Sequence, residues 1–291
     1  MKLRTLLDLA RVSNLPTVWS NVLAGAVLGG ATLPALPVVV AGVSGSLLYS
    51  GGMFLNDAFD SEIDARERPE RPIPSGRIAR STVLALGYGM LALALAILVT
   101  AGTELVMAGA AVALGVVVYD RWHKGVVWSP IVMGFCRAGL YVMGALAVGA
   151  RLDGGVLLPA ASLLFYVVGL TYVARFENAS AVGRVWPTAF LLAPATVVVL
   201  SLDLAREPTE HFSALALVLL AHVAWTLRAL VIALRGGRGA IPRAVVGLIA
   251  GISLVDAAFI ALRHAQEYEI ILFALAAFGL TLLFQRWVRG T

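Results

Sequence analysis

Apolar runs dominate the chain from residue 14 onward, separated by short breaks that contain polar residues, glycine or proline. Most runs are about 20 residues long, the length that crosses a bilayer as an α-helix. The alternating polarity typical of outer-membrane barrel strands is absent. The pattern predicts an all-α fold, a polytopic membrane bundle of nine or ten transmembrane helices. The candidate spans are 14–31, 35–55, 81–101, 104–119, 126–149, 156–174, 186–202, 211–233, 243–262 and 268–286.

The stretch Met1–Arg11 differs from the spans because basic residues alternate with leucines. Lys2, Arg4 and Arg11 flank these leucines, which suits a short amphipathic helix on the membrane surface. A cleaved signal peptide is the alternative. We favour a retained helix, because the first span is long, contains Pro16 and leads directly into another span.

Composition supports the same class. Of 291 residues, 60% are apolar and 13% are charged, and the mean hydropathy is +0.89. Soluble chains have about 45–50% apolar and about 25% charged residues, so a soluble enzyme, a disordered chain and a disulfide-stapled secreted module are excluded.

The single cysteine, Cys136, lies inside an apolar run and is expected to pack in the core. The net charge of +5 fits an anionic membrane surface; no basic stripe outside the spans indicates a nucleic-acid partner.

The basic residues predict the orientation of the bundle. If the N-terminus lies inside, all but four of the 22 Lys and Arg fall at the cytoplasmic ends of the spans. Arg151, Arg206 and Arg263 fall on the other side, and Arg137 lies within a span. This positive-inside asymmetry favours an even number of spans with both termini in the cytoplasm. We expect an integral protein of a prokaryotic cytoplasmic membrane.

Acidic residues gather at the end of the second span. If that helix continues past residue 55, Asn56, Asp60 and Asp64 recur every four residues along one face, and Asp57 joins them. Carboxylates packed this closely repel one another and need compensation at a membrane surface. Mg²⁺ provides it, because this ion binds oxygen ligands and is usually held by one or two carboxylates together with substrate phosphates.

The loop after these acids carries arginines stiffened by prolines. The arginines are Arg66, Arg68, Arg71, Arg77 and Arg80, and the prolines are Pro69, Pro72 and Pro74. Guanidinium groups suit phosphate oxygens, so acids that hold a metal beside arginines that hold phosphate indicate a diphosphate site. The alternative is a solvated loop whose acids and arginines pair with one another.

Asn56–Asp64 followed by Arg68–Arg77 resembles the first signature of the UbiA-type intramembrane prenyltransferases, and the layout of spans extends the resemblance over nearly the whole chain. The resemblance implies one prenyltransferase domain over 1–291 with a central cavity open to the cytoplasmic side. It implies that a polyprenyl diphosphate donor is bound through Mg²⁺. The implied metal ligands are Asn56, Asp57, Asp60 and Asp64, with Asp57, Asp60 and Asp64 catalytic, Asn56 also contacting the donor, and Arg71 and Arg77 assisting.

The chain departs from the family at the second acidic motif, an Asp-x-x-x-Asp sequence at the end of the sixth span. Here Glu177 is the one acid, followed by Asn178, and Arg175 and Arg184 bring positive charge. Glu177 remains a candidate metal ligand. Two interpretations follow: Arg175 binds the diphosphate in place of a second metal, or the protein binds a prenylated lipid without ionising it. The departure, together with the Glu67–Pro72 run, resembles the EboC-like branch of the superfamily.

Further polar residues near the membrane complete the candidate site. Arg137 is expected either to contact the donor diphosphate or an acidic acceptor, or to pair with Asp256. The family resemblance suggests that Lys124, in a basic-aromatic loop, binds phosphate. Asn21 is expected to line a polar cavity. Aromatic faces that would stabilise a carbocation are Tyr49, Tyr141, Tyr166 and Tyr172, of which Tyr172 is a substrate-binding candidate.

We therefore predict prenyl transfer from an allylic diphosphate to an unidentified small-molecule or lipid acceptor, with Mg²⁺ offsetting the charge of the departing diphosphate. The main alternative is a non-catalytic carrier or exporter of a prenylated or lipid-linked metabolite, which the altered second motif favours. A proton-coupled transporter is a third possibility; it would contain internal repeats and broken helices.

Overall fold

The computed structural model describes residues 3–31, 35–123, 126–176, 185–202, 210–263, 268–288 and 290, and the regular structure in these ranges is entirely helical. The all-α prediction is confirmed for these ranges. The helices are α1 (Leu3–Ala10), α2 (Leu15–Leu28), α3 (Leu36–Phe59), α4 (Ser61–Glu67), α5 (Arg80–Leu98), α6 (Thr103–Trp122), α7 (Ser129–Ala147), α8 (Gly154–Ala174), α9 (Ala193–Ser201), α10 (Glu210–Arg235), α11 (Ala240–Arg263) and α12 (Tyr268–Phe284). Short 3₁₀ segments span Val12–Asn14, Val99–Ala101 and Trp186–Leu192.

Within the described residues, seven helices are long and apolar enough to cross a membrane, namely α3, α5, α6, α7, α8, α10 and α11. Shorter apolar helices cover Trp186–Ser201 and Tyr268–Phe284, and α2 has 14 residues. A helical membrane bundle is therefore confirmed, whereas nine or ten spans stays a prediction. The helix of the second span continues past residue 55, as the acidic face requires: α3 extends to Phe59 and carries Asn56 and Asp57 on its last turn.

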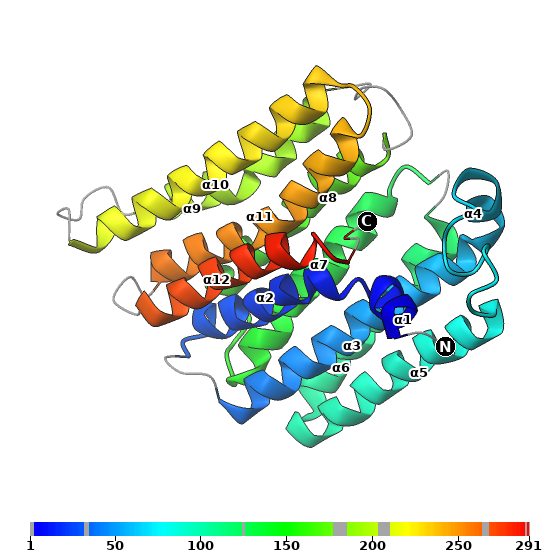
Figure 1. Ribbon diagram of the computed structural model, residues 1–291. Coiled ribbons are helices and arrows are strands. Elements are labelled where there is room, and N and C mark those ends of the chain that lie inside the picture. The colour runs from blue at the N-terminus through cyan, green and yellow to red at the C-terminus, as the bar shows by residue number, and fades with distance from the viewer. Residues whose placement is uncertain are drawn as a thin grey trace.

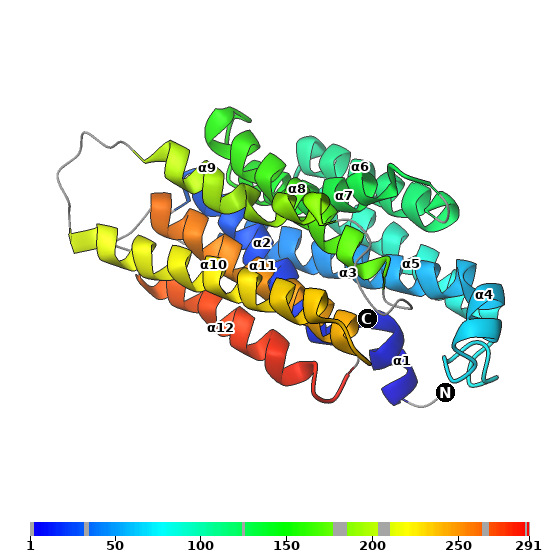
Figure 2. The same cartoon turned by 90° about the horizontal axis from the view of Figure 1, so that it is seen from above.

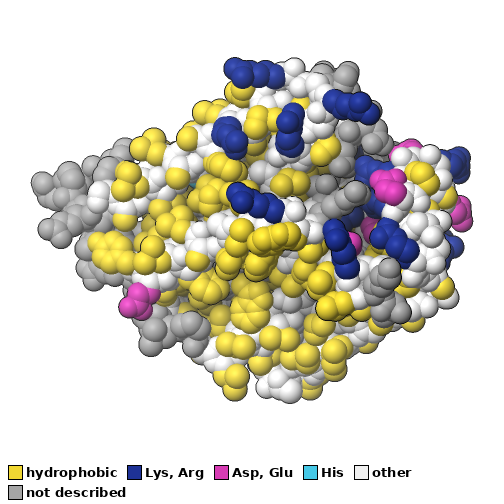
Figure 3. Space-filling view, in the orientation of Figure 1, with side chains coloured by type: hydrophobic (Ala, Val, Ile, Leu, Met, Phe, Trp, Pro, Cys, Tyr) yellow, Lys and Arg dark blue, Asp and Glu magenta, His cyan; other side chains and the backbone are white. Residues whose placement is uncertain are grey.

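The long helices lie alongside one another (Figures 1 and 2). Helix α3 packs against α5 and α6, α7 packs between α2 and α8, and α11 contacts α2, α10 and α12. Helix α4 and both chain termini lie at the same end of the bundle in both views. At this end acidic and basic side chains intermingle, whereas hydrophobic side chains cover much of the middle (Figure 3). On this face charge gathers at one end of the bundle, and the cytoplasmic orientation of that end stays a prediction.

The N-terminal helix is more closely packed than the sequence indicated. The expected helix over the first residues is present as α1, which contacts α3. Leu9 is fully buried in a small core with Phe54, Ala58 and Val83. Because α1 is held by the end of α3, the residue that follows it, Arg11, is placed beside the acidic motif.

Helices α2 and α7 approach each other at two glycines. A Cβ atom on Gly25 would overlap the backbone carbonyl of Tyr141, and a Cβ atom on Gly144 would overlap the carbonyl of Val22. Small residues let membrane helices come this close. The contact brings polar residues of α2 against α7 in the middle of the bundle.

A buried carboxylate links three helices there. Asp256 of α11 is fully buried and accepts hydrogen bonds from Ser20 Oγ at 2.5 Å, Asn21 Nδ2 at 2.8 Å and the Tyr141 hydroxyl at 2.7 Å. The expected alternative of an ion pair with Arg137 is not found among the described contacts; Arg137 instead donates from Nη2 to Thr17 at 2.8 Å. Asp256 is satisfied by neutral donors, which identifies a structural role.

We expect Asp256→Ala to lower the unfolding midpoint of the purified protein in detergent. The substitution removes the acceptor shared by three buried donors, and each buried group left unpaired costs about 1–3 kcal/mol. Asp256→Asn keeps one acceptor oxygen and is expected to give an intermediate midpoint. An alanine variant that melts with the wild type would contradict this role.

Candidate functional site

A cavity of about 420 Å³ lies among α3, α6, α7, α8 and α11, toward the end of the bundle that carries α4. Its outer part is lined by charged side chains, including Asp60, Asp64, Arg68 and Arg71. Its inner part is apolar, with walls formed by Leu48, Met133, Leu140, Val167, Ile249 and Ile252. The cavity therefore offers a charged opening to a polar group and an apolar interior to a hydrocarbon.

The acidic motif lies at this opening because the chain stays helical through it. Helix α3 ends at Phe59, but Asp60 keeps near-helical backbone angles, and the Asp64 amide donates to the Asp60 carbonyl at 2.8 Å. Asn56, Asp60 and Asp64 consequently lie along one side and line the cavity. Asp57 is buried next to them but does not belong to the lining.

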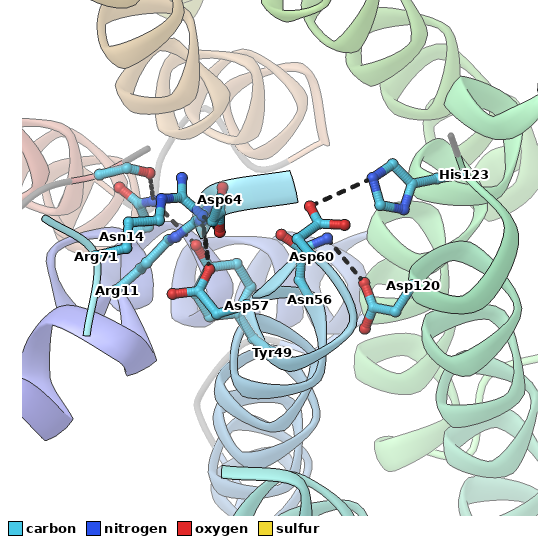
Figure 4. Close-up of polar contacts among 11 residues, drawn as sticks. Arg11, Asn14, Tyr49, Asn56, Asp57, Asp60, Asp64, Arg71, Asp120 and His123 are labelled. Carbon is cyan, nitrogen blue, oxygen red and sulfur yellow. Dashed lines mark hydrogen bonds and ion pairs between the residues drawn. The ribbon is translucent and has the colours of Figure 1, made fainter. Parts of the chain in front are cut away.

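Arg71 joins two of the motif's carboxylates. Its Nη1 lies 3.0 Å from Asp57 Oδ1 and 3.0 Å from Asp64 Oδ2, and Arg11 Nη2 lies 3.3 Å from Asp57 Oδ1 (Figure 4). Burial raises the pKa of Asp64. The nearby Arg71 guanidinium lowers this pKa, and the negative charge of Asp57 raises it further. The alternative that acids and arginines pair with one another is thus partly realised. The pairs nevertheless border a cavity and are not a fully solvated loop.

Two residues at the end of α6 face the other side of the motif. Asn56 Nδ2 donates to Asp120 Oδ1 at 3.2 Å, and His123 Nε2 lies 3.6 Å from Asp60 Oδ2 (Figure 4). Both Asp120 and His123 line the cavity. The sequence pointed to Lys124 in this loop but not to Asp120 or His123. Asp120 is an acid at the end of a predicted span, which marks it as unusual. However, no regular spacing in the sequence relates Asp120 to Asn56.

The donor set fits a hard cation that is completed by substrate. Among the described residues, no three His, Cys, Asp or Glu side chains gather closely enough to hold a metal by themselves. Mg²⁺ is usually bound by one or two carboxylates plus substrate phosphates, so such a gathering is not required. The buried Asp120 Oδ2 atom has no hydrogen-bond partner, and the amide and carboxylates beside it are the oxygen ligands that Mg²⁺ prefers.

A buried arginine lies further inside the cavity. Arg137 is 9% exposed, lines the cavity and places its guanidinium 5.5 Å from the centre of the Tyr49 ring. No carboxylate of the described residues lies within ion-pair distance of it. Asn14 holds the Tyr49 hydroxyl at 2.9 Å and the Gly290 carbonyl at 2.9 Å, which fixes this wall of the cavity.

Several predicted site residues lie elsewhere. Arg77 is exposed outside the cavity, where its guanidinium donates to Ser75 and to the Glu70 carbonyl. Tyr172 packs edge-on against Phe176 and does not line the cavity. Besides Asp57, three more residues lie outside the lining and are fully buried in helix contacts, namely Asn21, Tyr141 and Tyr166. Helical periodicity does not reveal which face of a span meets the cavity. The expectation that Asn21 lines it is wrong, and the roles predicted for Arg77 and for the tyrosines stay predictions.

Arg175 lies at the opening of the cavity, as expected of a residue near phosphate. Its Nη2 donates to the Val126 carbonyl at 2.6 Å and to Ser129 Oγ at 2.7 Å, so the start of α7 holds it in place. Lys124 and Glu177 lie outside the described residues. Their predicted roles stay predictions.

Comparison with known proteins places this geometry in context. The model of the UbiA prenyltransferase family matches residues 15–278. The digeranylgeranylglyceryl phosphate synthase of Ignicoccus hospitalis is 34% identical over 150 residues, which cover 50% of this chain and 48% of that protein. The corresponding synthase of Hyperthermus butylicus is 30% identical over 189 residues, covering 60% of this chain and 63% of that protein. The matched region thus spans less than two thirds of either relative.

Among solved structures, a UbiA homolog from Archaeoglobus fulgidus bound to GPP and Mg²⁺ superposes with a TM-score of 0.65. The superposition covers 92% of this chain and 99% of that chain at 15% sequence identity. At this identity the likeness establishes a shared fold.

Proposed function

The chain belongs to the UbiA prenyltransferase family, and on that premise we propose that it transfers a prenyl group from an allylic diphosphate to a small-molecule or lipid acceptor, at the cytoplasmic side of the membrane. The observation that carries the proposal is the cavity itself. Its carboxylates and all of its arginines except Arg137 lie at one end, and its inner walls are otherwise mainly apolar. An amphipathic substrate with a diphosphate head and a hydrocarbon tail matches both parts.

The residues at the opening have defined tasks. Asn56, Asp60 and Asp64 would hold Mg²⁺, which when bound supplies positive charge against the departing diphosphate. Arg71 borders the same space and presents donors suited to phosphate oxygens. Arg175, held by the start of α7, adds a fixed positive charge near the diphosphate. This charge favours the interpretation in which an arginine replaces a second metal.

The inner cavity protects the reacting carbon. As the allylic C–O bond breaks, positive charge develops on the prenyl group, and apolar walls such as Leu140 and Ile252 exclude the water that would capture it. The Tyr49 ring lines the same space and offers a π face to that charge. Arg137 has no carboxylate partner among the described residues, and we assign to it an anionic group of the substrates, either the donor diphosphate or an acidic acceptor.

The proposal is tested by incubating the purified full chain with Mg²⁺, geranylgeranyl diphosphate and candidate acceptors, and by measuring diphosphate release. The relatives' names contain geranylgeranyl groups on a glyceryl phosphate, so this donor and a glycerophosphate lipid acceptor are tried first. Acceptor-dependent release of diphosphate supports transfer. Tight donor binding without release, across the acceptors tried, would support the carrier and contradict the enzyme.

Removal of the metal is expected to stop the reaction. Chelation with EDTA should lower diphosphate release by at least about 100-fold, because a bound metal contributes several kcal/mol of charge stabilisation in the transition state. Excess Mg²⁺ should restore the rate. Release that continues unchanged in EDTA would contradict a metal-dependent mechanism, while leaving transfer itself demonstrated.

A further inference from the structure

We propose that Asp120, at the end of α6, is a further metal ligand at the cavity opening. It would join Asn56 and Asp60 of the first acidic motif in the metal site of the proposed function. The inference rests on the proposed function, because a diphosphate completes the coordination. It extends that function by assigning a residue outside both acidic motifs of the family.

The Asp120 carboxylate is only partly satisfied by hydrogen bonds. Asp120 is 4% exposed, lines the cavity and accepts one hydrogen bond, from Asn56, on Oδ1. Its Oδ2 atom is buried and has no hydrogen-bond partner. No Lys, Arg or His of the described residues lies within ion-pair distance of Asp120. A buried carboxylate left in this state is costly, and a cation at Oδ2 would remove the cost.

The side chains of Asn56 and Asp120 are close enough to bind one metal ion together. Mg²⁺ holds its ligands at about 2.0–2.1 Å in an octahedron, so two adjacent ligand oxygens lie about 3 Å apart. Asn56 Nδ2 and Asp120 Oδ1 are separated by 3.2 Å. Rotation of the Asn56 amide by half a turn would put its oxygen in place of its nitrogen. Two oxygens would then face each other at the edge length of a magnesium octahedron.

Asp60 lines the same cavity opening as Asn56 and Asp120. It follows Asn56 by four residues and lies on the same side of the α3–α4 segment, where it lines the cavity (Figure 4). In the structure its Oδ2 lies 3.6 Å from His123 Nε2, so the carboxylate is directed toward the end of α6 that carries Asp120. Two carboxylates from different helices and one amide leave coordination positions for phosphate and water, the usual arrangement for Mg²⁺.

The proposal is tested with Mn²⁺ as a spectroscopic probe on the full chain. Binding is followed by the loss of the free Mn²⁺ electron paramagnetic resonance signal, in the presence of inorganic pyrophosphate. Asp120→Asn is expected to weaken Mn²⁺ binding on the order of 10- to 100-fold or more, since even indirect contacts to metal ligands change affinity by about this factor. The substituted amide has nearly the shape of the carboxylate and would still fit beside Asn56. Glu62→Gln, a charge-neutralising change on the exposed side of α4, is the matched control and should bind Mn²⁺ as the wild type does.

A change of ligand atom distinguishes coordination from a structural role. Asp120→Cys should lose Mn²⁺ affinity and gain affinity for Cd²⁺, because thiolates favour softer metals. Unchanged Mn²⁺ affinity in folded Asp120→Asn, with affinity lost in Asp60→Asn, would overturn the assignment of Asp120 and leave the proposed function standing. Absence of Mn²⁺ binding in the wild type with pyrophosphate would instead contradict the metal site as a whole.

Discussion

Replacing Asp60 with asparagine is expected to lower the rate of diphosphate release by on the order of 10²- to 10³-fold, the loss typical of removing one preorganised group that stabilises transition-state charge. Asp60 lines the charged opening of the cavity and lies one helical turn after Asn56. Asparagine has nearly the same shape, so the cavity keeps its form while one negative charge and one metal ligand are lost. Single-turnover release of diphosphate from geranylgeranyl diphosphate measures the effect on chemistry.

The control for this prediction is a charge change of the same sign nearby. Glu62 is exposed on α4 and does not line the cavity, so Glu62→Gln should release diphosphate at the wild-type rate. Both variants should elute as monodisperse protein with similar unfolding midpoints. A rate within about threefold of wild type in folded Asp60→Asn would place the chemistry elsewhere, since a factor of three corresponds to less than about 1 kcal/mol.

Replacing Gly144 with valine is expected to destabilise the whole bundle. Any Cβ at this position would overlap the Val22 carbonyl, and Gly25 makes the same kind of contact from α2 with Tyr141. The backbone carbonyl of Val22 cannot move aside as the end of a flexible side chain can, so α2 and α7 would have to separate. Overpacked cores cost about 1–3 kcal/mol, and backbone overlap belongs at the upper end. The expected result is a markedly lower unfolding midpoint in detergent and a smaller yield of monodisperse protein.

Gly89 offers the matched control because it lies in α5 with no atom within 4 Å of where a Cβ would be. Gly89→Val should therefore melt close to the wild type, with only the small change expected from helix propensity. Similar midpoints for the two valine variants would mean that α2 and α7 do not pack as closely as described. Separation of these helices should also reduce activity, because Thr17 of α2 holds Arg137 of α7 beside the cavity.

Local sequence was enough to predict the all-helical membrane class, the end of the bundle where charge gathers, and the acidic face at the end of α3. These features depend on neighbouring residues. Hydropathy sums over a contiguous run, and the helical repeat puts Asn56, Asp60 and Asp64 on one side whatever surrounds them. The same reasoning identified the arginine loop, from which Arg71 reaches Asp57 and Asp64 across 14 and 7 residues of chain.

The residues that face the motif and line the cavity became known only from the packing of the helices. Asp120 meets Asn56 across 64 residues of chain, and Arg137 meets Thr17 across 120, so no local spacing relates the partners. Asn21 points into a helix contact with Asp256 instead of the cavity for the same reason. The length of an apolar run can be counted from the residues of the span itself. Whether a polar side chain faces the cavity depends on which helix packs against that span. Here close contacts such as that of Gly144 with Val22 determine the packing.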